Sequence, residues 1–480
     1  MDATLAGFII YLVVMLVIGL ITYRKNESNA DFFLGGRKMN PWVVALSERS
    51  AGESAWLLLG LPGAAFALGF IEIWTALGCL LGIFFYWQVI ASRIRLLSAK
   101  TNAITLPDVF SNHFSRGGPW LRITAMVIIV FFFTFYLAAQ FNGAGKVLNV
   151  TFGMNHFYGM MIGAVIIVLY TMMGGFLAVV WTDVIQGVLM FAALVVLPVA
   201  AMVKLAENGV VIQDVMAKSA EGARNLTGGR TGWAAVAVVA GGLSWAFGYM
   251  GQPHLLTKFM SIGDPEKMKI SRRIAFVWAV PAFAGAIAIG ILGTAMYGNN
   301  FFADTERIMP QMATDLMPAW IAGILISAAI AAMMSTADSL LLVVSSTVAE
   351  DFCHHVLRLR LSPKAMVNLS RLVTLSVGLA AFVIAISSEK LIFSMVSYAW
   401  AGLGSSFGPA ILLMLWWKKT TWQGVLAGMI TGAVSTVVWT EIHWLDQMIS
   451  VRFVSFIVAF TAVVLVSRVT LGRRGSAASV

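Results

Sequence analysis

Residues 41–66 read PWVVALSERSAGESAWLLLGLPGAAF, and this stretch decides the class of fold. Its length and apolar ends suit a helix that crosses about 30 Å of hydrocarbon, for which roughly 20 residues are needed. Its middle holds Glu48, Arg49 and Glu53 together with three serines, and such a segment cannot face lipid. Gly52 and the Leu-Pro-Gly triplet further on favour a broken helix, which membranes tolerate only where it lines a cavity or is buried in protein. The stretch therefore predicts an interrupted membrane helix at a functional site.

The rest of the chain has the composition of a polytopic membrane protein. Of its 480 residues, 59% are hydrophobic and 11% are charged, whereas a soluble domain has about 25% charged residues. This excludes a soluble enzyme, a disordered protein and a disulfide scaffold, and no phosphate-binding loop or soluble domain is evident. The all-α chain is predicted to cross the membrane about thirteen times, at 5–23, 41–66, 70–92, 119–145, 157–180, 183–203, 231–254, 274–298, 318–348, 366–387, 391–417, 421–441 and 450–468.

The net charge of +10 is explained by topology. With the N-terminus outside, 23 of the 32 Lys and Arg residues fall in cytoplasmic loops and 8 in outer loops, which leaves Arg49 inside a span. This distribution follows the positive-inside rule and argues against a nucleic-acid partner. The two cysteines, Cys79 in a span and Cys353 in a cytoplasmic loop, are not expected to form a disulfide.

The ninth span carries a second group of polar residues, in the stretch Ala331–Ser339. The adjacent hydroxyls of Ser335 and Thr336, followed by Asp338, offer the hard oxygen ligands that suit Na⁺. The alternative is that each hydroxyl bonds the carbonyl of its own helix, as single Ser and Thr residues usually do. Two hydroxyls and a carboxylate so close together favour an ion site.

Two further features lie in the sixth and seventh spans. Asp183 follows Trp181-Thr182 near a span end, so it is either a helix cap or part of the ion path. The seventh span, 231–254, holds five glycines and a proline, which argues against a regular helix, and Trp245 and Tyr249 share one face there. Unwound backbone with aromatic neighbours is typical of a substrate site at membrane depth. For His254 at the end of this span, a satisfied or solvated side chain is favoured over a proton carrier.

The two most interrupted spans, the second and the seventh, are five spans apart. Interrupted helices at corresponding positions in two halves indicate an inverted-repeat transporter. We therefore expect one transporter domain over residues 1–480. Its parts would be a first helix and loop (1–40), a first repeat (41–203), a second repeat (231–417), and two peripheral helices with a tail (421–480).

Several short motifs, in order along nearly the whole chain, carry a family resemblance. They are 31–37 (DFFLGGR), 56–64 (WLLLGLPGA), 106–108 (LPD), 174–179 (GGFLAV) with 181–183 (WTD), 248–254 (GYMGQPH), 334–336 (MST), 350–351 (ED) and 397–402 (SYAWAG). With these motifs the sequence resembles the solute:sodium symporter family, and within it most closely the bacterial sodium/proline symporters. The resemblance implies a LeuT-like 5+5 inverted repeat in a bacterial inner (plasma) membrane, with the C-terminus in the cytoplasm.

The resemblance also implies site residues, position by position. For sodium these are main-chain oxygens at Ser50, Glu53 and Ala332 and the hydroxyls of Ser335 and Thr336. For substrate they are Trp56, Tyr136, Trp245, Tyr249 and Pro253, to which helical spacing adds Gln140 one turn after Tyr136. Arg49, Asp183 and Asp338 are expected to lie on the ion path or to couple the ion to the solute.

One position departs from the family pattern. Proline symporters carry an Asp that is important for sodium where this chain has Gly52, and Glu53 follows it directly. On a regular helix Glu53 points about 100° away from position 52. Glu53 either replaces the missing charge or neutralises Arg49, and a carboxylate that carries a proton is the third alternative.

We expect a secondary active transporter that imports a small amino acid, foremost L-proline, with Na⁺ by alternating access. The alternatives are an H⁺-coupled or other-solute symporter of the same fold, and a transporter-like ligand sensor. No cofactor is expected besides the coupling ion. No nucleophile–base pair or metal-ligand cluster is evident, so an enzyme is not expected.

Overall fold

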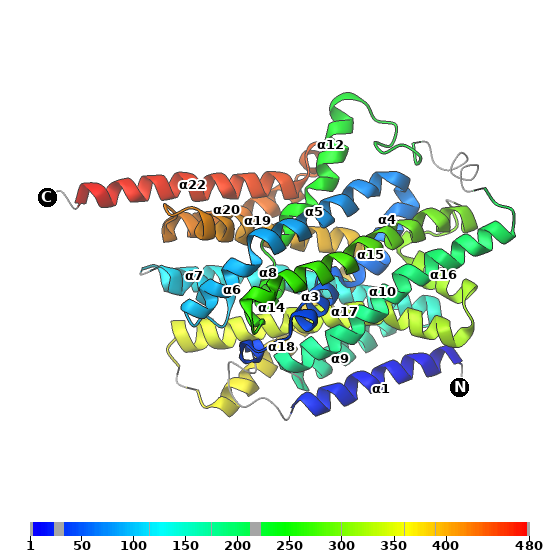
Figure 1. Ribbon diagram of the computed structural model, residues 1–480, viewed down its shortest axis with the longest axis horizontal. Coiled ribbons are helices and arrows are strands. Elements are labelled where there is room, and N and C mark those ends of the chain that lie inside the picture. Colours follow the sequence, from blue (N-terminus) through cyan, green and yellow to red (C-terminus); the bar gives the residue numbers. More distant parts are fainter. Residues whose placement is uncertain are drawn as a thin grey trace.

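The computed structural model describes residues 3–23, 33–114, 116–173, 175–211, 222–298, 300–359, 361–388 and 390–477. These residues form helices and contain no strand, apart from one isolated parallel bridge between Met39 and Ile262. Most of the helices run along the long axis of the molecule. Helix α1 begins at one end of this axis and α22 ends at the other (Figure 1), as an odd number of membrane crossings requires.

The long helices are α1 (Ala3–Tyr23), α5 (Ile73–Val89), α8 (Gly118–Phe152), α9 (His156–Met173), α10 (Phe176–Glu207), α15 (Met268–Tyr297), α17 (Ala319–Ser346), α18 (Pro363–Ser387), α19 (Ile392–Trp416), α20 (Trp422–Glu441) and α22 (Val451–Ala477). The shorter ones are η1 (Gly35–Arg37), α3 (Pro41–Ala55), η2 (Trp56–Gly60), α4 (Leu61–Leu68), η3 (Gly69–Glu72), α6 (Ala91–Lys100), α7 (Leu106–His113), α12 (Gly232–Leu243), α13 (Trp245–Tyr249), α14 (Pro253–Ser261), η4 (Pro265–Lys267), η5 (Thr305–Arg307), α16 (Ile308–Leu316), η6 (Thr347–Val356) and α21 (His443–Met448).

Ten helical stretches of the described chain are long and apolar enough to cross a membrane. One of them, Pro41–Val89, has 49 residues, and as one straight helix it would reach about 74 Å, more than twice the hydrocarbon thickness. It therefore crosses more than once, and the chain turns at Gly69, whose φ of +73° favours glycine. Ala3–Met15 and His156–Met172 are shorter apolar stretches. The membrane protein is thus multi-pass, while thirteen crossings remain a prediction.

The predicted boundary between the fifth and sixth spans was wrong. The sequence predicts a break formed by Gly174-Gly175 and Trp181-Thr182-Asp183, with spans at 157–180 and 183–203. Residues 181–183 lie inside α10, which begins at Phe176 directly after the extended Gly175. Glycine favours a break here because, without a Cβ atom, it loses more conformational freedom in a helix than any other residue. Asp183 is therefore seven residues into a continuous helix, far from any cap.

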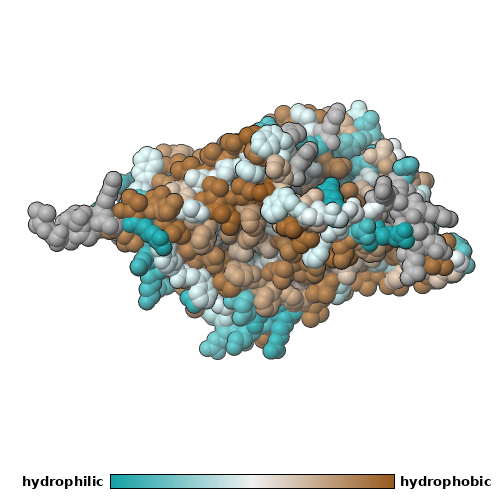
Figure 2. Space-filling model, turned by 90° about the horizontal axis from the view of Figure 1, so that it is seen from above, coloured by the Kyte–Doolittle hydropathy of each residue, from teal (hydrophilic) through white to brown (hydrophobic). Residues whose placement is uncertain are grey.

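Large apolar side chains cover much of the outer surface (Figure 2). Val277 is 72% exposed and Leu379 is 63% exposed, on two different long helices. In water such patches would be an aggregation hazard, but facing lipid tails they are the expected surface of a membrane protein.

Glycines bring the inner helices into close contact. A Cβ atom on Gly285 of α15 would lie 1.9 Å from the main-chain oxygen of Leu194 on α10. One on Gly402 of α19 would lie 2.1 Å from the ring of Phe132 on α8. Inside a bilayer there is no hydrophobic driving force between helices, so the close van der Waals packing that small residues permit holds them together. Helices α10, α15 and α17 of this tightly packed group lie against α3, and α19 lies against α13.

Candidate binding site at two interrupted helices

The first interruption lies at Ser54, near the end of α3. Ser54 has φ +50° and ψ −170°, a conformation that L-residues rarely adopt. Its hydroxyl accepts a hydrogen bond from the Trp56 amide at 3.1 Å, and the Ala55 amide donates to the side-chain oxygen of Gln140 at 3.2 Å. Side chains thus bond two main-chain amides at the break, and the Trp56 amide also donates to the main-chain oxygen of Glu53. Gly52, which the sequence suggested as a breaker, lies within the helical part.

The second interruption separates α13 from α14. Gln252 between them is extended, with φ −82° and ψ 107°, and Pro253 opens α14. Gly251 lies so close to α19 that a Cβ atom there would be 2.6 Å from the main-chain oxygen of Leu403. The expectation of an irregular helix over 241–254 is confirmed, because this stretch forms parts of three separate helices.

The hydroxyl pair on α17 reaches the end of α3 just before its break. Ser335 donates to the main-chain oxygens of Ser50 at 3.1 Å and Ala332 at 3.0 Å. Thr336 donates to the main-chain oxygen of Ala51 at 2.9 Å. The Thr336 hydroxyl thus bonds another helix rather than only its own, unlike a typical single Thr in a membrane helix.

The structure therefore brings together four of the five residues that the resemblance assigned to sodium. The main-chain oxygen of the fifth, Glu53, accepts the Trp56 amide and contacts neither hydroxyl among the described residues. Buried oxygens from two helices, one of them interrupted, form the kind of ligand set that a hard monovalent cation needs.

A charged cluster fills the face of α3 next to these oxygens. Arg49 lies between two carboxylates: it contacts Glu48 through two nitrogens, and its Nη1 lies 2.6 Å from Glu53 Oε1. Arg49 also donates to the Tyr86 hydroxyl at 2.6 Å. All three charged side chains are fully buried. With both carboxylates ionised the cluster carries a formal charge of −1, which would attract a cation.

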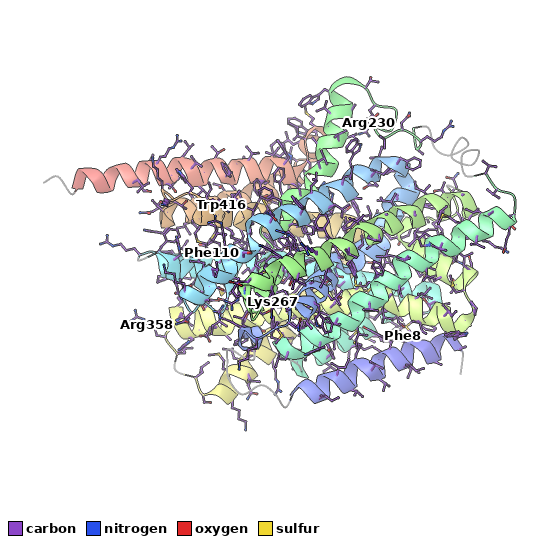
Figure 3. The ribbon with its side chains drawn as sticks, in the orientation of Figure 1. Phe8, Phe110, Arg230, Lys267, Arg358 and Trp416 are labelled. Carbon is purple, nitrogen blue, oxygen red and sulfur yellow. The ribbon has the colours of Figure 1, made fainter. Side chains whose placement is uncertain are left out.

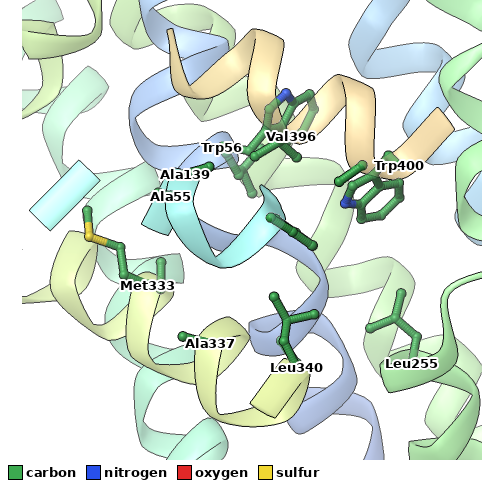
Figure 4. Close-up of a cluster of buried hydrophobic side chains, with 14 of the residues drawn as sticks. Ala55, Trp56, Ala139, Leu255, Met333, Ala337, Leu340, Val396 and Trp400 are labelled. Atoms are coloured by element: carbon green, nitrogen blue, oxygen red, sulfur yellow. The ribbon is translucent and has the colours of Figure 1, made fainter. Parts of the chain in front are cut away.

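Aromatic side chains enclose the break in α3. The ring of Trp56 lies 4.6 Å from that of Trp245, and Tyr249 lies 4.5 Å from Trp400. Trp400 lies one turn beyond Val396 on α19, the helix that also approaches Trp56 (Figure 4). The Tyr249 hydroxyl contacts the Glu53 carboxylate at 3.3 and 3.4 Å. This ties the aromatic group to the charged cluster.

Of the residues predicted to bind substrate, Trp56, Trp245 and Tyr249 lie in this group and Gln140 lies at the break. Tyr136 lies one turn before Gln140 on α8 and packs edge-on against His254, with ring centres 6.1 Å apart. Pro253 begins the helix that carries His254.

His254 itself is buried, and neither ring nitrogen has a hydrogen-bond partner among the described residues. The expectation of a satisfied or solvated histidine was wrong, because α14 packs inward against α3 and α17 rather than reaching the surface.

Sequence reasoning missed Trp400, Tyr86 and Lys258. Trp400 lies in the SYAWAG motif at 397–402, which carried the family resemblance but no assigned role. Tyr86 had no sequence signal, because it lies on a plain apolar helix and its partner Arg49 is 37 residues away.

Asp183 forms a second buried ion pair. Its Oδ2 lies 2.8 Å from Lys258 Nζ and accepts the Ser47 hydroxyl at 2.6 Å. The interpretation of Asp183 as a helix cap is therefore wrong. Asp338 is fully buried, and neither of its carboxylate oxygens has a hydrogen-bond partner among the described residues. Lys258 and the neighbour of Asp338, Ser339, both line one small, partly open cavity.

Family and sequence comparisons show what this chain is similar to. The model of the sodium:solute symporter family matches residues 32–432. A sodium/proline symporter of Salmonella typhimurium is 38% identical over 449 residues, which cover 92% of this chain and 88% of the relative. The high-affinity proline transporter PutP of Bacillus subtilis is 38% identical over 430 residues, covering 89% of this chain and 90% of the relative.

Solved structures share the fold at low sequence identity. A Na⁺-coupled sialic acid symporter in a substrate-bound, outward-open state superposes with a TM-score of 0.82 at 18% identity, covering 98% of both chains. MhsT in complex with L-phenylalanine superposes with a TM-score of 0.58 at 14% identity, covering 90% of this chain and 99% of the other. The fold is therefore that of the LeuT-like transporters.

Proposed function

Because this chain belongs to the sodium:solute symporter family, we propose that it imports L-proline or a closely related small amino acid together with Na⁺. The observation that carries the proposal is the meeting of Ser335 and Thr336 on α17 with the main-chain oxygens of α3 just before its break. The chain's similarity to named sodium/proline symporters over most of its length supports the choice of proline.

We propose that Na⁺ binds among the oxygens of Ser50, Ala332, Ser335 and Thr336. Without the ion the two hydroxyls satisfy the carbonyls themselves. When the ion arrives, the hydroxyl hydrogens turn away and their oxygens become ligands. The ion thereby fixes the end of α3 against α17 and, with it, the position of the break.

The solute would bind directly beyond this break. The amides of Ala55 and Trp56 are held by Gln140 and Ser54, which a substrate carboxylate would displace. Their positive dipole ends suit an anionic group. The rings of Trp56, Trp245 and Tyr249 would cover the apolar ring of proline. Because ion and solute both stabilise the same arrangement of α3, each raises the affinity for the other.

Transport then requires that the site open alternately to the two sides. We propose that residues 41–203 and 231–417 act as two inverted repeats that move relative to each other. We further propose that the chain lies in a bacterial inner membrane with its N-terminus outside, since its basic residues concentrate on the opposite side. The cavity beside Lys258 and Ser339 would be the start of the release path.

Coupling to H⁺ is the second candidate, and two observations favour it. Glu53 provides a buried carboxylate at the position next to Gly52, and Asp338 provides another without a hydrogen-bond partner among the described residues. A buried carboxylate is costly when charged, so either could take up a proton. In that case Asp183 and Asp338 would belong to a proton path, and Arg49 would supply a fixed positive charge beside it.

The test is uptake of labelled L-proline into proteoliposomes that contain the purified protein. A Na⁺ gradient at equal pH on both sides should drive accumulation, and replacing Na⁺ by choline should abolish it. A pH gradient without Na⁺ serves as the comparison. Uptake that requires only the pH gradient would refute sodium coupling. No uptake above that of empty liposomes under either gradient would refute proline as the solute.

A further inference from the structure

A group of three potential metal ligands lies on η6, outside the transport site. Segment η6 continues α17 and has π-helical geometry, in which residues four and five apart share one face. Glu350, His354 and His355 have this spacing. The segment ends two residues before Arg358, which lies toward the end of the molecule opposite to Phe8 (Figure 3). No metal-ligand cluster was expected from the sequence, but the described residues contain this one.

The distances between the ligand atoms match those around a bound metal ion. Glu350 Oε1 lies 3.0 Å from His354 Nδ1 and 3.5 Å from His355 Nε2. The ligand atoms of all three residues lie within 4.8 Å of one another. Around a tetrahedral Zn²⁺ with bonds of about 2.0–2.1 Å, neighbouring ligand atoms are about 3.3–3.4 Å apart. Small side-chain rotations would bring the three atoms to this spacing.

The surroundings of the group suit a cation that exchanges with water. Glu350 is buried, and its second oxygen has no hydrogen-bond partner among the described residues. The two histidine side chains are 46% and 39% exposed, which leaves an approach from the aqueous side. The nearest further carboxylate, Asp108, lies 3.8 Å from His355 Nε2 but is paired with Arg122 at 2.5 Å. A water molecule is therefore the natural fourth ligand.

We propose that Glu350, His354 and His355 bind one Zn²⁺ ion, with the fourth position open to water. Three protein ligands with an open position distinguish such a site from a closed structural zinc site, which has four. The ion would therefore be exchangeable. It would fix η6, and with it the end of α17, the helix that carries Ser335 and Thr336.

The experiment measures zinc binding directly and does not depend on transport. The full chain, purified in detergent without a histidine tag, is titrated with ZnCl₂ by calorimetry, and bound zinc is counted after dialysis. We expect one zinc ion per chain and an affinity at least about tenfold lower in H354A/H355A. Zinc should also raise the melting temperature of the wild-type protein, but not that of this double variant.

Two matched variants test the assignment. His113 is an exposed histidine on α7, and Cys353 is a thiol within η6 itself. H113A and C353S should both bind zinc as the wild type does. Equal zinc binding by H354A/H355A and the wild type, loss of binding in either matched variant, or no zinc on the wild-type chain would overturn the proposal. None of these results depends on which solute the protein transports.

Discussion

Replacing Ser335 by alanine tests the proposed ion site most directly. In the structure the Ser335 hydroxyl donates to the main-chain oxygens of Ser50 and Ala332, at 3.1 and 3.0 Å. With Na⁺ bound, the same oxygen would be a ligand. The alanine variant loses the hydrogen bonding in the ion-free state and the sodium contact in the ion-bound state. The effect on sodium affinity is the difference between these two losses.

The size of this difference follows from typical values. A polar contact to a charged partner contributes about 1.5–3 kcal/mol, and a hydrogen bond between neutral groups about 0.5–1.5 kcal/mol. Subtracting the second from the first leaves about 1–1.5 kcal/mol lost in the sodium-bound state, which corresponds to roughly a five- to twelvefold weaker sodium affinity. The Na⁺ concentration for half-maximal proline uptake should rise by this factor.

The assay is initial-rate uptake in proteoliposomes over a range of external Na⁺ concentrations. Ser327 supplies the matched control, because it lies on the same helix and is equally buried. Among the described residues its hydroxyl bonds only the carbonyl of Gly323 within that helix, at 2.7 Å. S327A should keep the wild-type sodium dependence. If S335A also keeps it, or if both variants shift alike, the ion does not bind at Ser335.

Three other outcomes are expected. R49Q leaves two buried carboxylates without their shared cation, and it should destabilise the protein by about 3–5 kcal/mol. A fluorescence melt in detergent should show the loss. The triple variant E48Q/R49Q/E53Q should regain most of the lost stability. G285V should prevent stable folding, because its Cβ would overlap a main-chain oxygen. G241V, whose Cβ would meet no neighbouring side chain or other helix within 4 Å, should be recovered from membranes at the wild-type level. S54G should support uptake, because glycine accepts the backbone conformation at this break, whereas S54V should abolish it; equal uptake by both variants would refute a role for this conformation.

Much of the site could be predicted because charge and hydroxyl groups are rare inside membrane spans. Arg49 and Glu53, four residues apart, were expected on one face and lie in contact at 2.6 Å. Ser335 and Thr336 stood out in the same way. Each of these signals is local, since it depends only on residue type and spacing within one helix.

The other features of the candidate site could not be predicted, because they depend on contacts between distant parts of the chain. The pair of Asp183 with Lys258 joins residues 75 positions apart, and no local pattern indicates it. The position of the break, at Ser54 rather than at Gly52, also depends on a contact with another helix. Intrinsic preference favours glycine at a positive φ, but Gln140 from another helix satisfies an amide directly after Ser54 and so stabilises the break there.

The oxygens that α3 offers to Ser335 and Thr336 belong to the main chain of Ser50 and Ala51. A point mutation in α3 changes a side chain but cannot delete a carbonyl. Changes to the neighbouring side chains at 48, 49, 52 and 53 therefore leave this part of the proposed ion site in place, provided that the buried charges at 48, 49 and 53 stay balanced and position 52 stays small. An engineer could exploit this separation by varying these four positions to alter solute preference, with sodium dependence as a property to be retained in every library member.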